Sequence, residues 1–228
     1  MYTVEVAGLS KRYGKIEALR GVNLRVPEGA VFGLVGPNGA GKTMLIKALV
    51  GALRLPSGEM KWLGLAPHKD RNELRGRIGY MPQLPALYDD LLARDNVEFF
   101  GAAYRTHDLR ERVAEVVQLT DLADRAKDPV HAFSGGMKRR VSLTCTLVHR
   151  PEMLLLDEPT AAVGPQLRSR LWKTFQKMAK DGATLFISAQ SMDEATPCNR
   201  IAILGKGQVR RALWAMCGTT SSSWRATA

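Results

Sequence analysis

Short apolar segments alternate with amphipathic ones along most of the chain. A strand that is covered on both faces has no polar side, so continuous apolar runs predict buried strands, here over 30–35, 78–81, 153–156, 184–188 and 201–204. The first of these runs leads into a helix that we expect from Thr43 to about Val50. Strands that alternate with helices predict an α/β fold with a largely parallel central sheet.

Amphipathic patterns dominate between about residues 84 and 150, which predicts a helical insertion there. Its clearest helix has one apolar face, formed by Leu109, Val113, Val116 and Val117. Another helix is expected to begin at Pro165, because proline fits the first turn of a helix. The buried face of that helix is expected to hold Leu167, Leu171, Phe175 and Met178.

The N-terminal part of the chain has patterns that predict secondary structure, whereas the C-terminal tail has none. Residues 1–6 alternate like a strand, and Pro56 to Gly58 predict a turn before a strand over 59–63. No internal repeat or linker is visible, so we expect one domain over residues 1–210. The tail, residues 211–228, has no usable periodicity, and its structure is not predicted.

The composition indicates the class of protein and the compartment in which we expect it. With 228 residues, 45% apolar and 24% charged, the chain resembles ordinary globular proteins. Its three cysteines are odd in number and far apart, which predicts reduced thiols in the cytosol and no zinc site. We find no signal peptide pattern and no apolar run near the roughly 20 residues that span a bilayer. Any membrane function is therefore expected to act through a partner.

The charge balance favours an anionic partner without choosing one. The chain has 33 basic and 22 acidic residues, a net charge of +11. Nucleic acid, an acidic lipid surface or bound phosphates would all suit this charge. Basic residues scattered over a solvated surface would explain it equally well, so charge alone decides nothing.

Residues 36–43, GPNGAGKT, fit the phosphate-loop pattern G-x-x-x-x-G-K-[ST] between a predicted strand and a predicted helix. Glycines let backbone N–H groups turn around phosphates at the positive end of the helix. Lys42 is expected to reach the β- and γ-phosphates, and the Thr43 hydroxyl to ligate Mg²⁺. The segment predicts an ATP site formed by Gly36, Pro37, Asn38, Gly39, Ala40, Gly41, Lys42, Thr43 and Met44.

An acidic pair, Asp157 and Glu158, ends the apolar strand at 153–156. A carboxylate at the end of a buried strand can hold magnesium through water, and the adjacent carboxylate can polarise an attacking water. Many strands end in an acid, so the pair gains its meaning from the phosphate loop upstream. We expect Asp157 at the metal and Glu158 as a catalytic residue.

Residues 133–137, FSGGM, lie between these two motifs and open a predicted helix. Alone, Ser-Gly-Gly would be a helix N-cap with a flexible lead-in. In this position it resembles the signature motif of ABC ATPases, usually written L-S-G-G-Q, and the resemblance covers about residues 3–210. It implies a P-loop NTPase fold with a mostly parallel central sheet, an N-terminal antiparallel β subdomain and a helical subdomain at about 84–150.

The resemblance also implies further roles. Tyr13 is similar to the aromatic residue that stacks on adenine, and Gln83 to the glutamine that reaches Mg²⁺ and the attacking water. Ser134, Gly135 and Gly136 would touch the γ-phosphate of an ATP held by a second ABC subunit, packed head to tail. An integral membrane permease would be the other partner, placing the chain in the cytoplasm at the inner face of the membrane.

The segment FSGGMKRR, together with MDEA at 192–195, is most similar to the branch that drives exporters of drugs, antibiotics or polymers.

Two positions depart from the family pattern. Gly164 stands where the family has an aspartate, and Gln190 stands where it has the switch histidine. Gln190 keeps a donor but cannot become cationic. Both changes leave ATP binding intact and predict slow hydrolysis.

Two alternatives stay open beside a transporter ATPase. One is a soluble ABC ATPase that acts on ribosomes or nucleic acid, which the positive charge would suit. Such proteins usually carry two ATPase domains and a charged linker, and neither is visible here, so no nucleic acid is expected. The other is a regulatory subunit that binds nucleotide without useful hydrolysis.

Overall fold

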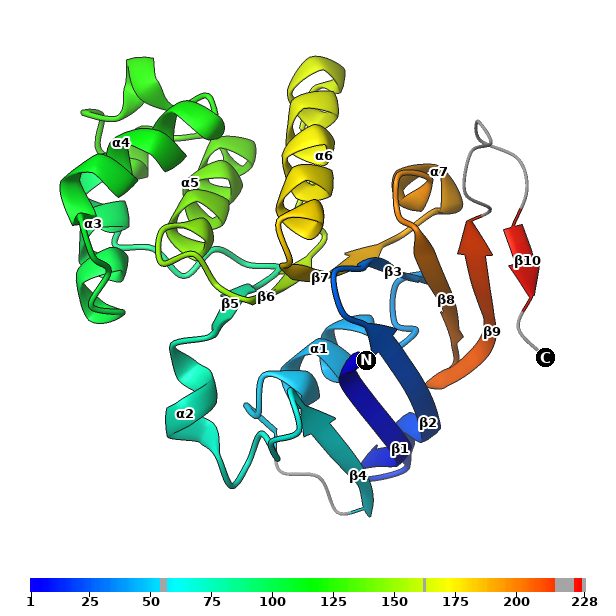
Figure 1. The fold of residues 1–228 in the computed structure, drawn as a ribbon. Coiled ribbons are helices and arrows are strands. Elements are labelled where there is room, and N and C mark those ends of the chain that lie inside the picture. The colour runs from blue at the N-terminus through cyan, green and yellow to red at the C-terminus, as the bar shows by residue number, and fades with distance from the viewer. Residues whose placement is uncertain (54–56, 162, 216–223, 227–228) are drawn as a thin grey trace.

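A seven-stranded sheet forms the centre of the molecule (Figure 1). The computed structural model describes residues 1–53, 57–161, 163–215 and 224–226. The strand order is β10-β9-β8-β3-β7-β6-β5, with parallel pairing from β8 to β5 and antiparallel pairing at β9 and β10. The strands are β3 (Val31–Val35), β5 (Ile78–Met81), β6 (Met153–Asp157), β7 (Thr184–Ala189), β8 (Arg200–Gly205), β9 (Gln208–Ala215) and β10 (Trp224–Ala226). The predicted mostly parallel sheet is confirmed.

A second sheet is antiparallel and comes from the N-terminal part of the chain. Its order is β2-β1-β4, and its strands are β1 (Tyr2–Tyr13), β2 (Ile16–Pro27) and β4 (Ser57–Trp62). Long β1 and β2 form a hairpin that turns between Tyr13 and Ile16. This is the antiparallel subdomain that the family resemblance implies.

Three of the helices gather in one region. Helices α3, α4 and α5 lie together to one side of the sheet, drawn in green in Figure 1. The bounds are α1 (Lys42–Leu49), α2 (Arg71–Arg75), α3 (Ala93–Ala103), α4 (Leu109–Leu119), α5 (Gly135–Leu147), α6 (Pro165–Lys180) and α7 (Met192–Ala195). Short 3₁₀ turns occur at Ala123–Arg125 and Val130–Ala132.

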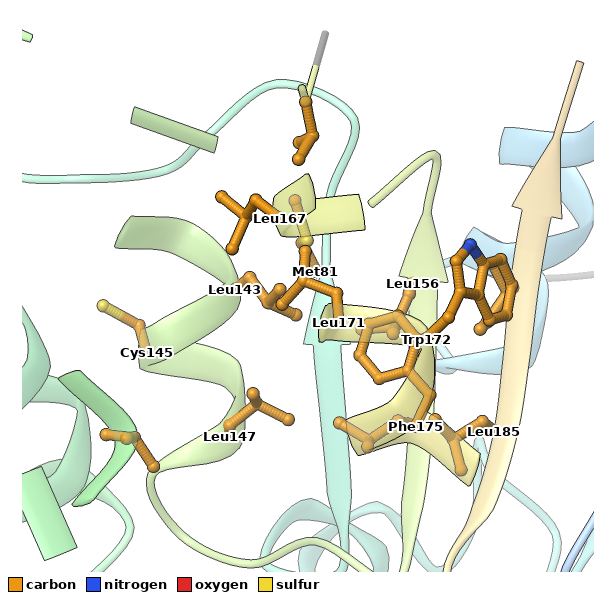
Figure 2. Close-up of a cluster of buried hydrophobic side chains, with 14 of the residues drawn as sticks. Met81, Leu143, Cys145, Leu147, Leu156, Leu167, Leu171, Trp172, Phe175 and Leu185 are labelled. Carbon is orange, nitrogen blue, oxygen red and sulfur yellow. The ribbon is translucent and has the colours of Figure 1, made fainter. Parts of the chain in front are cut away.

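Both faces of the central sheet are buried, which explains why its strands are apolar throughout. One face packs against α5 and α6 (Figure 2), where the apolar contacts include Leu156, Leu185, Leu147, Leu171 and Phe175. The other face packs against α1 and the antiparallel sheet. There Phe32 and Phe186 stack with ring centroids 5.3 Å apart. A strand with two covered faces needs no polar side.

The turn expected at Pro56–Gly58 is wrong for the two residues that the structure describes. Ser57 and Gly58 already belong to β4, which ends at Trp62, and Pro56 lies outside the described residues. A Cβ on Gly58 would lie 2.6 Å from Leu9 Cα, and Gly58 has a φ of 95°. Glycine at this position therefore allows close approach to β1, which a local pattern cannot distinguish from a turn.

The tail that carried no pattern contributes backbone to the central sheet. Strand β9 pairs with β8, and β10 pairs with β9. Of the three cysteines, Cys145 and Cys198 are buried free thiols, whereas Cys217 lies outside the described residues. Burial raises the pKa of both thiols, that of Cys198 to about 12.

Candidate nucleotide site

The phosphate loop connects β3 to α1 and lies close to the backbone of β7, β8 and β2. Gly36 N–H donates to Ala189 O at 3.2 Å, which fixes the start of the loop to the end of β7. A Cβ on Gly36 would lie 2.3 Å from Leu204 O, and one on Gly41 would lie 2.7 Å from Ala18 O. Gly41 also has a φ of 106°. Both glycines are therefore required by close backbone approach and, at Gly41, by the left-handed conformation.

Lys42 is the first residue of α1, and its side chain is 5% exposed. Its Nζ donates to Gly36 O at 2.7 Å and lies 3.3 Å from Pro37 O. Glu158 Oε1 lies 3.4 Å from the same nitrogen. The ammonium group is thus held within the curve of the loop, where a phosphate would offer a stronger, charged acceptor.

The acidic pair lies at the end of β6, beside the end of β7. Asp157 faces Ser188 in the strand pairing, and Ser188 Oγ donates to Asp157 Oδ1 at 2.5 Å. The same Oγ accepts from Glu158 N–H at 3.0 Å. The charge of Asp157 also acts on Tyr80, whose pKa rises to about 12, mainly through burial and further through this carboxylate.

Asp157 Oδ2 is buried and has no hydrogen-bond partner among the described residues. A buried carboxylate oxygen without a partner costs free energy unless a ligand satisfies it. A water molecule of a hydrated Mg²⁺ would do so, because magnesium usually keeps several waters and binds through one or two carboxylates plus phosphates. This orphaned oxygen, beside a phosphate loop, fits the expected Mg²⁺.

Glu158 is 5% exposed and adopts a left-handed backbone conformation, with a φ of 54°. Such a conformation is uncommon for a residue other than glycine and is concentrated at functional sites. Gln190 Nε2 donates to Glu158 Oε2 at 2.9 Å, while Lys42 lies beside Oε1. Gln190 is itself fixed by its N–H, which donates to Glu194 Oε2 at 3.0 Å. Both oxygens of the Glu158 carboxylate are therefore engaged.

A hollow of about 410 Å³ opens over the phosphate loop. Gln83 and Glu158 line it together with residues 37–44 of the loop. The opposite wall includes Ile16, Ala18, Arg20 and Lys206. The structure thus brings Gln83, Glu158, Lys42 and Thr43 to one cavity, at the carboxyl ends of parallel strands where ligands of α/β sheets bind.

Tyr13 lies at the rim of this region. The residue is 46% exposed, and its hydroxyl lies 3.5 Å from Met44 Sδ. The Nζ of Lys11 lies 5.1 Å from the ring centroid. An exposed residue next to Met44, which directly follows the phosphate loop, is placed where a base could stack on its ring.

Ser134, Gly135 and Gly136 are not brought to the hollow, whose lining among the described residues contains none of them. Ser134 caps α5 by accepting from Met137 N–H at 3.4 Å. Ser134 and Gly135 are exposed. The positive N-terminal end of α5 is therefore exposed and does not line the hollow over the chain's own phosphate loop.

Two residues of this region were missed by the sequence analysis. Ser188 bridges the acidic pair, and Arg139 donates to the carbonyls of Gln83 and Ala161. The alignment of β6 with β7 could have indicated Ser188, since the ends of parallel neighbours lie together. Arg139 stands in a run of three basic residues, which by itself is typical of a solvated surface.

The fold and this site define a P-loop NTPase. The sequence model of the family described as "ABC transporter" matches residues 19–161. The linearmycin resistance ATP-binding protein LnrL of Bacillus subtilis (strain 168) is 36% identical over 90% of this chain and 67% of its own length. The daunorubicin resistance ATP-binding protein DrrA3 of Streptomyces coeruleorubidus is 38% identical over 90% and 66%.

A comparison with solved structures indicates the same family. A dimeric structure of the ATP-binding cassette MJ0796 in a post-hydrolysis state, bound to ADP and Pi, is similar with a TM-score of 0.84 and 27% identity. That comparison covers 92% of this chain and 97% of the other. The chain belongs to the ABC transporter family, which confirms the resemblance, and it spans about two thirds of the length of these curated relatives.

Proposed function

We propose that this chain is the ATP-hydrolysing subunit of an ABC exporter that works as a dimer with a membrane permease. The observation that carries the proposal is the meeting of Lys42 and Glu158 at one hollow over a complete phosphate loop, with the buried Asp157 next to Glu158 at the end of β6. The names of the resistance proteins above support export. The soluble alternative has no specific support in the site.

Binding of ATP would rearrange the contacts of Lys42. Its Nζ would leave the carbonyls of Gly36 and Pro37 for the β- and γ-phosphates, because charged acceptors form stronger hydrogen bonds. Loop amides and the start of α1 would hold the remaining phosphate oxygens. Tyr13 would stack on the adenine from the rim of the hollow.

Thr43, Asp157 and Gln83 are the residues that would hold Mg²⁺, which when bound neutralises charge that develops on the phosphates. Once Lys42 turns to the phosphates, Glu158 Oε1 is released, while Gln190 still holds Oε2. The freed oxygen can accept a hydrogen bond from the attacking water and orient it. Glu158 would thus be a catalytic residue whose orientation depends on Gln190.

A second copy would complete the site. Ser134, Gly135 and Gly136 do not line their own nucleotide hollow, and Ser134 and Gly135 are exposed, so these residues could contact the γ-phosphate of ATP on a partner subunit. The related cassette solved as a dimer supports this arrangement. Gly164 lacks a carboxylate that would order this interface. The absence of this carboxylate supports slow turnover.

The permease would contact the apolar surface beside Gln83. Leu84 is 82% exposed, and Tyr88, Leu91 and Phe99 are also exposed large apolar side chains. Tyr88 and Phe99 pack edge to face at 4.8 Å between centroids. Within the described ranges, none of the helices combines the length and apolar character needed to cross a bilayer. The surface next to Gln83 suits a separate membrane protein.

A nucleotide-binding regulatory subunit is the second candidate, because Gln190 and Gly164 replace two groups at the catalytic end of the site. Calorimetry and steady-state ATPase assays with MgATP separate the two functions. The Lys42→Ala variant is expected to lose about tenfold or more in affinity, since a charged hydrogen bond contributes about 1.5–3 kcal/mol. Lys47→Ala, on the exposed face of the same helix, is the matched control.

Measurable hydrolysis that disappears in Glu158→Gln would support the ATPase. Tight binding without any hydrolysis above that of Glu158→Gln would favour the regulatory subunit. Equal affinity in Lys42→Ala and the unchanged protein would overturn the nucleotide site itself.

A further inference from the structure

Three consecutive basic residues at the start of α5 contact three different segments. Lys138 Nζ lies 2.8 Å from Asp89 Oδ1, and Arg140 donates to Asp121 O at 3.0 Å. Arg139 lies between them in sequence and donates through two nitrogens of one guanidinium. Nη2 donates to Gln83 O at 3.0 Å, and Nη1 donates to Ala161 O at 3.2 Å.

The two acceptors belong to loops on either side of the nucleotide site. Gln83 lines the hollow over the phosphate loop. Ala161 belongs to the turn that follows the acidic pair, and its N–H donates to Glu158 O at 3.2 Å. Ala161 thus accepts from Arg139 through its carbonyl and donates to Glu158 through its N–H, so a shift of this residue would act on the backbone of Glu158, whose left-handed conformation leaves little freedom.

Arg139 is also connected to the surface proposed for the partner subunit. Ser134, Gly135 and Gly136 form the cap and first turn of α5, and Arg139 follows within the same helix of 13 residues. The second half of α5 is buried, from Val141 to Leu147. Such a packed helix moves as a unit, so a displacement of its first turn displaces Arg139.

We propose that Arg139 is a positioning residue that couples the two nucleotide sites of the dimer. When Ser134–Gly136 contact the ATP held by the partner subunit, Arg139 would adjust the placement of Gln83 and Glu158 in the site of its own chain. The inference rests on the proposed function. Each ATP would thereby favour the active arrangement of the other site, and the two sites of the dimer would hydrolyse cooperatively. The planar fork suits this role, because its donors are held in fixed directions, whereas a lysine ammonium group is a compact charge on a flexible stem.

The test compares Arg139→Lys and Arg139→Gln with Arg140→Lys and Arg140→Gln. Arg140 is a matched control because it lies next to Arg139 on the same helix and contacts Asp121, and neither Arg140 nor Asp121 lines the hollow. We expect both Arg139 variants to lose about tenfold or more in kcat, while KM and the Kd for MgATP change less than about threefold. The Hill coefficient for ATP should fall toward 1.

Hydrogen exchange of the chain without nucleotide gives a second readout. Amides of residues 83, 84, 158, 160 and 161 should exchange faster in Arg139→Lys than in Arg140→Lys. A role in stability alone would lower the melting temperature and leave kcat per folded molecule and the Hill coefficient unchanged.

Unchanged kcat in Arg139→Lys, or equal losses in the Arg140 variants, would overturn the inference while leaving the ATPase intact. If the unchanged protein hydrolyses no more ATP than Lys42→Ala, the proposed function fails, and the coupling fails with it. The two failures are therefore distinguished by the unchanged protein alone.

Discussion

Gln190 donates a hydrogen bond from its side-chain amide to Glu158 Oε2, at 2.9 Å. The two residues meet because β6 and β7 are parallel neighbours, and Asp157 pairs with Ser188 at their carboxyl ends. A residue at position 190 therefore reaches the carboxylate proposed to orient the attacking water. Gln190 can hold this carboxylate but cannot bring a positive charge to the phosphates.

Turnover should consequently be limited by positions 190 and 164. Gln190→His is expected to raise kcat, and Gln190→His with Gly164→Asp should raise it further, by about 100-fold, the lower end of the range for one transition-state donor. Affinity for ATP should stay within about threefold, because the interaction acts mainly in the transition state. Steady-state ATPase assays measure this, with Gln118→His on the exposed face of α4 as control. No gain in the double variant would show that Gln190 already performs the task of the histidine.

The introduced histidine should also create a pH dependence. A free histidine has a pKa of about 6.5, and the adjacent Glu158 carboxylate should raise it, because the charged form is favoured beside a carboxylate. The gain of Gln190→His over the unchanged protein should be largest below this raised pKa and should decline as pH rises through it. Profiles of kcat from about pH 5.5 to 9 for both proteins give the ratio. A ratio that is constant across this range would contradict a cationic role at this position.

Ser188 should be important for both stability and metal binding. Its hydroxyl donates to Asp157 Oδ1 and accepts from Glu158 N–H, so Ser188→Ala leaves two buried polar groups without these partners. We expect the free energy of unfolding to fall by about 1–3 kcal/mol. We also expect the Mg²⁺ concentration for half-maximal turnover to rise. Urea denaturation and magnesium titration measure these effects.

Ser169→Ala, on the exposed face of α6, should change neither quantity. Equal unfolding free energies for Ser188→Ala and Ser169→Ala would show that water replaces the hydroxyl without loss.

The sequence predicts the parts of the site that depend on neighbouring residues in the chain. The phosphate loop is such a part, because its glycines, Lys42 and Thr43 act within one strand–loop–helix segment. The buried strands were predicted for a similar reason, since burial on both faces produces continuous apolar runs.

Contacts between distant segments could not be predicted in this way. The role of Ser188 arises from the alignment of two strands, and that of Arg139 from the packing of α5 against two loops. The local pattern predicts Gly58 in a turn, whereas its lack of a Cβ allows close contact with Leu9 within the sheet. In each case the decisive partner lies in a segment that local periodicity does not reveal.

The most direct test is whether MgATP joins two copies of the chain through Ser134. In Glu158→Gln, ATP should bind without hydrolysis, so light scattering after sizing chromatography should show a dimer with MgATP and a monomer without nucleotide. Adding Ser134→Arg should abolish the dimer, because its bulk would block the γ-phosphate, and MgATP affinity of the monomer should remain. Ser169→Arg on α6 is the matched control and should still dimerise. A monomer for Glu158→Gln under saturating MgATP, or a dimer that persists with Ser134→Arg, would contradict the shared site.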